Sequence, residues 1–200
     1  MRVKLLAASS NQGKLREFRA LAAEYAGDIE IDLLPRFSEL AVFPEDEPTF
    51  AENAAGKALH YSRFTDEIIF ADDSGLVVAS LGGAPGVRSA RYAGENAADQ
   101  ERNAKLLAAL RGKTGDARNA KFVCIIAAAR KGKMLAVVSD SVEGTIANEP
   151  SGANGFGYDP LFYFSLLKKT FAELTEPEKN RLSHRGKAFR KLGKALSMTS

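Results

Sequence analysis

Two neighbouring carboxylates and a serine occur in residues 71–76, which read ADDSGL. Residues 67–70 form a strand-like apolar run before them, and Gly75 predicts that the chain turns there. Asp72 and Asp73 at a strand end repel each other unless a positive group neutralises them. A divalent cation would do this, and carboxylate oxygens suit magnesium that is bound together with substrate phosphates. Taken alone, the segment also fits a polar turn, with Asp72 capping a backbone amide and Asp73 in solvent.

A second polar segment follows the predicted strand at residues 3–7 and leads into a predicted helix. A strand, a polar turn and a helix in this order point backbone amides at an anion. The side chains of the turn add neutral donors and a positive charge, so the segment is a candidate phosphate site. Its residues are Ser9, Ser10, Asn11, Gln12, Gly13 and Lys14. An ordinary helix cap with a solvated lysine is the alternative interpretation.

A capping box formed by Thr49 and Glu52 predicts the start of the next helix. On that helix Asn53 and Lys57 are four residues apart, so they share one face and can point into the same site. Glu45 lies in the acidic loop before the helix and is a candidate metal ligand, and a solvated loop glutamate is the alternative.

The formal net charge of +3 divides unevenly along the chain. Residues 37–56 contain five acidic and no basic side chains, whereas residues 168–194 contain nine Lys or Arg and three Glu. A basic segment can bind nucleic acid, but a net charge of +6 (nine minus three) interspersed with glutamate is modest for that role. Acidic and basic segments that converge on one site would instead suit a metal ion and a polyphosphate.

Residues 151–160 read SGANGFGYDP, in which three glycines surround Phe156. Glycine lets the backbone approach a ligand closely. An aromatic ring on such a loop is a platform on which a nucleobase can stack, with a gain of about 1–3 kcal/mol. The alternative is a turn before the predicted strand at residues 161–164, with Phe156 in the core.

Ser183 is the predicted N-cap of a final helix. His184 and Arg185 then lie in its first turn, where backbone amides and the positive end of the helix dipole face a ligand. An arginine at this place can donate two hydrogen bonds to a keto oxygen and a ring nitrogen of a purine. A solvated basic helix is the alternative.

The length predicts a single domain over residues 1–200, with one lobe or two. A predicted hairpin at residues 121–142 implies a mixed sheet. Cys124 is the only cysteine and lies in an apolar run, which excludes a disulfide within the chain and favours a reducing compartment. No signal-peptide pattern opens the sequence, and no apolar run approaches the ~20 residues that span a membrane. We therefore expect a cytoplasmic protein.

Taken together, six segments resemble the inosine triphosphate pyrophosphatase family, the RdgB/HAM1 group of hydrolases that act on non-standard purine nucleotides. In chain order they read SSNQGK, FAENAAGKA, ADDSGL, GGAPGVRSARYAG, SGANGFGYDPLF and AELTEPEKNRLSHRGKA. They cover nearly the whole chain, and six such motifs in this order at these spacings are highly specific. The resemblance implies an α/β fold with an elongated mixed β-sheet flanked by helices, two lobes around a central substrate cleft, and a homodimer.

The resemblance also implies magnesium-dependent hydrolysis of ITP, dITP and XTP to the monophosphate and pyrophosphate. By matching motifs, the phosphates would be bound by Ser9, Ser10, Asn11, Gln12, Gly13, Lys14 and Lys57. The metal would be bound by Glu45 and Asp73 with Asp72 beside them, Asp73 would also be the base that activates water, and Ser74 would contact substrate. The base and sugar would be contacted by Phe156, Gly157, Tyr158, Asp159, Lys179, His184 and Arg185.

The acidic loop departs from the pattern of this family. Residues 43–48 read FPEDEP, whereas the family usually has Glu-Thr-Gly at this place. Asp46 or Glu47 could therefore take the role of metal ligand instead of Glu45.

The mechanism inferred from these residues is in-line attack of water on the α-phosphorus, with pyrophosphate as leaving group. Selectivity would arise at the 6-position of the purine, because a keto group accepts hydrogen bonds from His184 and Arg185 whereas an adenine amino group would meet donors. We expect a small purine triphosphate as partner, with no nucleic acid and no membrane. Two other functions stay open: a Maf-like pyrophosphatase or γ-phosphatase acting on other nucleotides, and a non-catalytic nucleotide- or RNA-binding module that uses the basic C-terminal helix.

Overall fold

The structure is a computed structural model that describes residues 3–25 and 29–197. Its α-helices are α1 (Gln12–Tyr25), α2 (Phe50–Tyr61), α3 (Asp99–Ala109), α4 (Glu176–Leu182) and α5 (His184–Ser197). Its strands are β1 (Val3–Ala7), β2 (Ile29–Leu33), β3 (Ile68–Val78), β4 (Asn119–Arg130), β5 (Lys133–Ile146), β6 (Phe162–Phe164) and β7 (Lys169–Thr170). Within the described residues, no helix combines the length and the apolar character that a membrane crossing requires.

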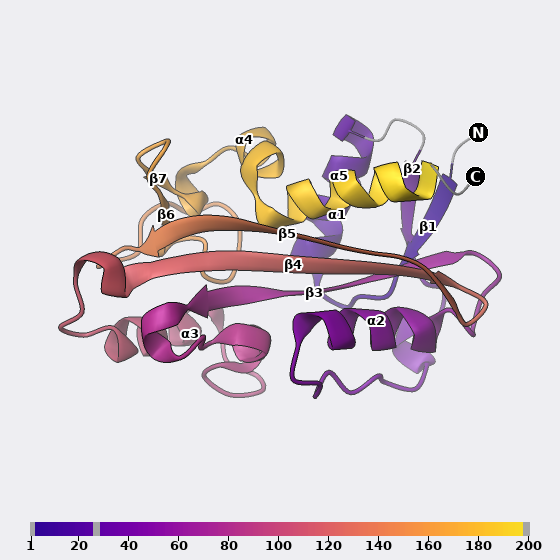
Figure 1. The fold of residues 1–200 in the computed structure, drawn as a ribbon, viewed down its shortest axis with the longest axis horizontal. Coiled ribbons are helices and arrows are strands. Elements are labelled where there is room, and N and C mark those ends of the chain that lie inside the picture. Colours follow the sequence, from indigo (N-terminus) through magenta and orange to yellow (C-terminus); the bar gives the residue numbers. More distant parts are fainter. Residues whose placement is uncertain (1–2, 26–28, 198–200) are drawn as a thin grey trace. The chain divides into compact units, whose positions relative to one another are not determined.

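The strands form a mixed sheet in the order β2-β1-β3-β4-β5-β6-β7 (Figure 1). β1 pairs in parallel with β2 and β3, whereas β6 pairs antiparallel with β5 and β7. Two residues, Lys131 and Gly132, connect β4 to β5, and both have positive φ angles of 50° and 73°. Such angles are typical of tight hairpin turns. The predicted mixed α/β sheet and its hairpin are therefore confirmed.

The chain divides into two compact units. Within the described residues, the first unit comprises the segment up to Asp73, the segment Cys124–Asp140 and the segment from His184 onward. The second unit comprises Ser74–Val123 and Ser141–Ser183. The boundaries fall inside β3, β4 and β5, so each of these strands contributes residues to both units.

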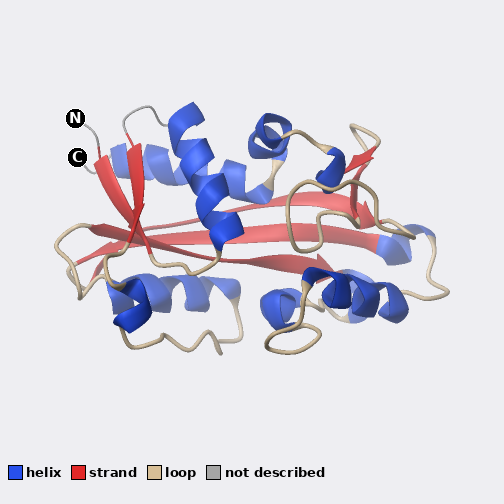
Figure 2. Ribbon diagram, turned by 180° about the vertical axis from the view of Figure 1, so that it is seen from behind, coloured by secondary structure: helices blue, strands red, loops and turns tan. Residues whose placement is uncertain are grey.

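The sheet of the first unit has two apolar faces, because successive residues of a strand point to opposite sides. Leu5 and Phe70 lie in a core cluster with residues of α1 and α5. Their chain neighbours Leu6 and Ile69 lie in another core cluster, with residues of α2. Figures 1 and 2 show the same arrangement, with α2 on one side of these strands and α1 and α5 on the other.

The second unit is built around aromatic side chains. The rings of Phe122 and Phe162 lie 4.5 Å apart between centroids, and those of Phe162 and Phe171 lie 4.8 Å apart in an edge-to-face arrangement. Leu106 of α3 and Tyr158, which follows the glycine-rich loop, belong to the same core. This core therefore supports both α3 and the end of the loop.

The prediction of a turn at Gly75 is wrong, because β3 continues through the ADDSGL segment without interruption. Gly75 is needed here for close approach. A Cβ atom at this position would lie 2.6 Å from the carbonyl oxygen of Gly86 and closer still to Oγ of Ser89. The backbone N–H of Leu76 donates to that Ser89 Oγ at 2.9 Å. A residue from a later segment of the chain thus supports the strand just beyond the two aspartates.

The start of α2 confirms Thr49 as its N-cap, although the backbone half of the predicted capping box does not form. Thr49 Oγ1 accepts a hydrogen bond from the N–H of Glu52 at 3.2 Å and donates to the carboxylate of Glu52 at 2.7 Å. The final helix α5 begins at His184, as predicted. The short helix α4 was not predicted, although Thr175 and Glu178 form a complete capping box at its start.

Candidate active site

The adjacent aspartates of β3 point to opposite faces of the sheet in the first unit. Asp72 is two residues beyond Phe70, so it points to the face covered by α1 and α5. Asp73 is two residues beyond Ala71, so it points to the face covered by α2. Both are buried, with 2% and 6% of their surface exposed. Each carboxylate therefore needs its own compensating partners.

Asp72 is neutralised by two cations. Lys14 Nζ from the first turn of α1 lies 2.8 Å from its Oδ2, and Nε of Arg185 from α5 lies 4.0 Å away. Burial is the largest single influence and opposes ionisation of both groups, but the surrounding opposite charges and the hydrogen bond between the pair together outweigh it, so the pKa of Asp72 is lowered and that of Lys14 is raised. Arg185 also forms a buried ion pair with Glu17 of α1. These four side chains form one charged network.

Asp73 lies in a different environment. Its Oδ2 accepts a hydrogen bond from Nδ2 of Asn53 at 3.0 Å. Burial, with a further contribution from the negative charges of Glu45 and Asp72, raises the pKa of Asp73 to about 6 in spite of the opposing effect of Lys14. Glu45 itself is hydrogen-bonded to Nζ of Lys57.

Asn53 connects the acidic loop to Asp73. Its Oδ1 accepts from the N–H of Glu47 at 3.1 Å, and its Nδ2 donates to the carbonyl oxygen of Glu47 as well as to Asp73. Glu45 is half-buried and interacts with Asp73, whereas Asp46 and Glu47 are exposed. This favours Glu45 among the acidic residues of the loop as a partner of Asp73.

The side chains around Asp73 include ligand types that a magnesium ion prefers. Among residues 3–25 and 29–197, no group of three or more His, Cys, Asp and Glu side chains could hold a metal by itself. Magnesium is usually held by one or two carboxylates, with phosphate oxygens and water completing its coordination. Glu45 and Asp73 supply two carboxylates whose repulsion a cation would relieve. These residues fit magnesium that binds together with a polyphosphate.

The turn after β1 leads directly to this charged network. The N–H of Ala8 donates to the carbonyl oxygen of Phe70 at 3.0 Å, which holds the turn beside β3. Ser9 Oγ accepts from the N–H of Asn11 at 3.2 Å, and Asn11 Oδ1 accepts from the N–H of Lys14 at 3.0 Å. Asn11 is therefore the cap of α1, and the helix starts at Gln12, inside the segment predicted as a turn.

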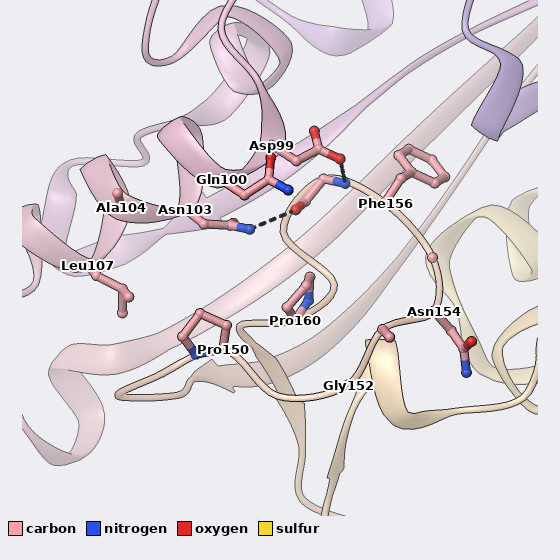
Figure 3. A pocket seen from close by; sticks show the side chains of 13 residues that line it. Asp99, Gln100, Asn103, Ala104, Leu107, Pro150, Gly152, Asn154, Phe156 and Pro160 are labelled. Atoms are coloured by element: carbon pink, nitrogen blue, oxygen red, sulfur yellow. Dashed lines mark hydrogen bonds between the residues drawn. The ribbon is translucent and has the colours of Figure 1, made fainter.

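The second unit contains the glycine-rich loop at residues 152–157. Asp159 Oδ2 accepts from the N–H of Phe156 at 2.9 Å and pairs with Nζ of Lys179 at 2.5 Å. The same Nζ lies 5.0 Å from the centroid of the Phe156 ring. The loop borders a cavity of about 420 Å³. Figure 3 shows this cavity with side chains of α3, including Gln100 and Asn103, on one side and Pro150 on another.

Comparison with known proteins places this architecture in a family. A family model described as the Ham1 family matches residues 5–195. The chain belongs to the Ham1 family. The match spans both compact units and all six motifs that the sequence analysis used, so the predicted resemblance is confirmed.

Similar Ham1 proteins are known by sequence and by structure. The dITP/XTP pyrophosphatase of Desulforamulus reducens is 46% identical to this chain, over 98% of the chain and 96% of that protein. The dITP/XTP pyrophosphatase of Geobacillus kaustophilus is 48% identical, over 94% and 92% of the two chains. The structure of a HAM1 protein from Coxiella burnetii matches with a TM-score of 0.85 at 41% identity, over 98% of this chain and 99% of that one. The mixed sheet flanked by helices is thus the Ham1 fold.

The first unit of this Ham1 chain brings together the residues predicted to bind metal and phosphate. The interacting residues of this group are Lys14, Glu45, Lys57, Asp72 and Asp73. Arg185, which was predicted to contact the base and sugar, also lies beside Asp72. His184 precedes Arg185 in α5 and is buried, as is Ser9. The second unit carries the other predicted residues, namely Ser74, Phe156, Gly157, Tyr158, Asp159 and Lys179. Among them Tyr158 is a core residue, and its hydroxyl donates to the carbonyl oxygen of Ser89 at 2.9 Å.

Two residues that contact the predicted site residues, Glu17 and Asn53, have no role that the sequence patterns predict. Glu17 lies in the apolar stripe of α1, and an acidic residue at such a position signals a buried partner. Asn53 was recognised only as sharing a helix face with Lys57. Asn53 contacts Asp73, and Glu17 is linked to Asp72 through Arg185. Both aspartates are distant in the sequence, so the roles of Asn53 and Glu17 depend on the fold.

Proposed function

We propose that this Ham1 protein hydrolyses ITP, dITP and XTP to the nucleoside monophosphate and pyrophosphate. The names of the relatives support this activity, since proteins 46% and 48% identical to the chain are dITP/XTP pyrophosphatases. The observation that carries the proposal is the pair of buried aspartates of β3. Asp72 pairs with Lys14, while Asp73 lies near Glu45, which pairs with Lys57. In this arrangement the lysines can bind a polyphosphate and the carboxylates can bind a cation.

The phosphate groups would be bound by Lys14 and Lys57 and by the N-terminus of α1. Asp72 holds the side chain of Lys14 and Asn11 holds its backbone. Lys14 therefore loses little conformational entropy when a phosphate binds. The exposed Ser10 and Gln12 stand at the same helix end, where free N–H groups attract anions.

Asp73 would be the general base. Its Oδ2 is held by Asn53 at 3.0 Å, which orients the carboxylate. Asp73 would take a proton from the water whose oxygen attacks the α-phosphorus, while the bond from that phosphorus to the bridging oxygen of pyrophosphate breaks. Magnesium bound by Glu45 and Asp73 would supply positive charge that stabilises the developing charge on the leaving group. We assign these two ligands in preference to Asp72, because Lys14 and Arg185 already neutralise it.

Phe156 would recognise the purine by stacking. Lys179 lies over the Phe156 ring and is itself held by its ion pair with Asp159. We keep His184 and Arg185 as donors to the 6-keto group. Arg185 is buried against Glu17 and Asp72, which orients its guanidinium group. GTP also has a 6-keto group, so this contact separates keto purines from ATP and leaves rejection of GTP to other contacts.

One assay tests this proposal. The full chain is incubated with ITP, dITP, XTP, GTP and ATP, with and without magnesium, and the products are identified by ion-exchange chromatography. We expect IMP and pyrophosphate from ITP only when magnesium is present, and a lower kcat/KM for ATP. Orthophosphate and IDP would indicate a γ-phosphatase, and turnover of other nucleotides alone would favour the Maf-like alternative. Salt-sensitive oligonucleotide binding without turnover would favour the binding module.

The proposal includes a homodimer in the cytoplasm, as the resemblance and the composition imply. Analytical ultracentrifugation of the full chain tests the first point, since a monomer at micromolar concentration would contradict it. Replacement of magnesium by manganese in the product assay tests how strictly the two carboxylates select the ion.

A further inference from the structure

Helix α3 binds both backbone groups of Gly157. Oδ2 of Asp99 accepts from the N–H of Gly157 at 2.7 Å, and Nδ2 of Asn103 donates to its carbonyl oxygen at 3.1 Å (Figure 3). Asp99 and Asn103 are four residues apart, so they lie on one face of the helix. Gly157 has a φ of +64°, which few other residues adopt. These contacts form a clamp on the backbone of Gly157.

Phe156 lies between this clamp and a second attachment. Its own N–H donates to Oδ2 of Asp159, which pairs with Lys179. In Figure 3 the Phe156 ring points away from Asn103 and Pro150. The loop is thus held by side chains at consecutive residues, and its backbone sets the direction in which the Cα–Cβ bond of Phe156 leaves the loop.

The amide of Asn103 is poorly suited to a packing role. The residue is 94% buried, because only 6% of its surface is exposed. Its Oδ1 atom has no hydrogen-bond partner among the described residues. A buried acceptor without a partner destabilises the folded state. The hydrogen bond from Asn103 Nδ2 to Gly157 is therefore the contact that accounts for a polar side chain at this buried position.

We propose that Asp99 and Asn103 are positioning residues that hold Gly157, and through it the Phe156 ring, in the orientation that a purine ring needs for stacking. This inference rests on the proposed function, because it assumes that Phe156 contacts the base. In this role they act through the loop and not by contact with the substrate. Loss of the clamp weakens substrate binding and leaves the chemical step nearly unchanged.

The first test is Asn103→Leu, which removes the bond to Gly157 and also the unpaired acceptor. We expect the KM for ITP to rise about tenfold, as for a lost hydrogen bond and poorer stacking, with kcat within about twofold and an unchanged or higher midpoint of urea unfolding. Gln100→Ala is the matched control, since Gln100 lines the same cavity and shows no hydrogen bond to the loop in the described part of the chain. An unchanged KM, or a KM change that parallels a loss of stability, overturns the proposal.

A second pair of variants covers the case in which Asn103→Leu does not fold. Asp99→Ala removes the acceptor for the N–H of Gly157, whereas Asp99→Asn retains an acceptor oxygen. We expect a KM several-fold higher for Asp99→Ala and a value near that of the unmodified protein for Asp99→Asn. Equal KM values for the two variants contradict a role for this hydrogen bond.

A spectroscopic readout separates this inference from the proposed function. The chain has no tryptophan, so Phe156→Trp introduces a single reporter in the loop. Adding Asn103→Leu to this variant is expected to increase acrylamide quenching of the tryptophan by at least about twofold, whereas adding Gln100→Ala is not. Unchanged quenching overturns the clamp whatever the substrate. Increased quenching in a protein that does not hydrolyse ITP supports the clamp and refutes only the proposed function.

Discussion

The two units hold their charged groups in different ways. In the first unit, Asp72 and Asp73 belong to a continuous strand and Lys14 to the first turn of a helix, so regular backbone geometry sets their directions. In the second unit, Asp159 follows a glycine-rich loop and pairs with Lys179 of a short helix. That loop belongs to no strand, and its path is held by hydrogen bonds from side chains to its backbone together with backbone bonds such as that from Asn154 N–H to the carbonyl oxygen of Ala172.

This difference suggests that the strand carboxylates and the loop contribute to different steps of the reaction. The backbone of a strand within a sheet is held rigidly, and the partners of Asp72 and Asp73 restrain their side chains, so these carboxylates can keep a charge at a defined place during a reaction. A loop that is held by a few hydrogen bonds can change without unfolding the protein, so it suits recognition. Substitution of the β3 carboxylates should therefore affect mainly kcat and stability, whereas substitution in the glycine-rich loop should affect mainly KM.

The largest effect is expected for Asp73→Asn. Loss of a general base typically lowers turnover by about two to four orders of magnitude, and kcat should fall accordingly while the affinity for nucleotide stays within a few-fold. Steady-state kinetics and calorimetric titration with ITP measure these two quantities. Asp32→Asn is the control, because Asp32 lies in the same unit with its side chain 53% exposed. Near-normal turnover of the Asp73 variant would remove this residue from the chemistry.

The next effect concerns stability. Arg185→Met leaves Glu17 without its partner in a buried site and takes one of two cations from Asp72. Removal of one partner of a buried ion pair costs about 3–5 kcal/mol, which should appear as a lower free energy of unfolding in urea. The double variant with Glu17→Leu should recover much of this loss, since no uncompensated glutamate remains. A loss that is the same in the single and the double variant would show that the pair is not coupled.

The smallest of the three effects is expected in the second unit. Phe156→Ala removes the stacking platform, and alanine substitutions of this kind cost about 1–3 kcal/mol of binding free energy. The KM for ITP should rise about tenfold or more, with a smaller change in kcat. Phe64→Ala in the first unit is the control, because that ring is 49% exposed. If Phe156→Ala lowered kcat as strongly as Asp73→Asn, the division between the units would be wrong.

Local signals in the sequence predicted much of the framework. The N-cap of α2 at Thr49 and the start of α5 at His184 depend on residues that are close in the chain, and the structure confirms both. The same reasoning could have found α4 from Thr175 and Glu178. The error at Gly75 has a different cause, since this glycine allows contact with Ser89, fourteen positions further along the chain, and no local pattern reveals that.

By itself, the sequence determined which residue types are available for chemistry and in which elements most of them lie, because helix periodicity, capping and strand patterns are local properties. The tertiary structure decided which charges meet. Since β3 continues through Asp72 and Asp73, its alternation sends the first toward Lys14 and Arg185 and the second toward Asn53. The partners come from helices far apart in the chain, and only packing on the two faces of the sheet brings them to these carboxylates.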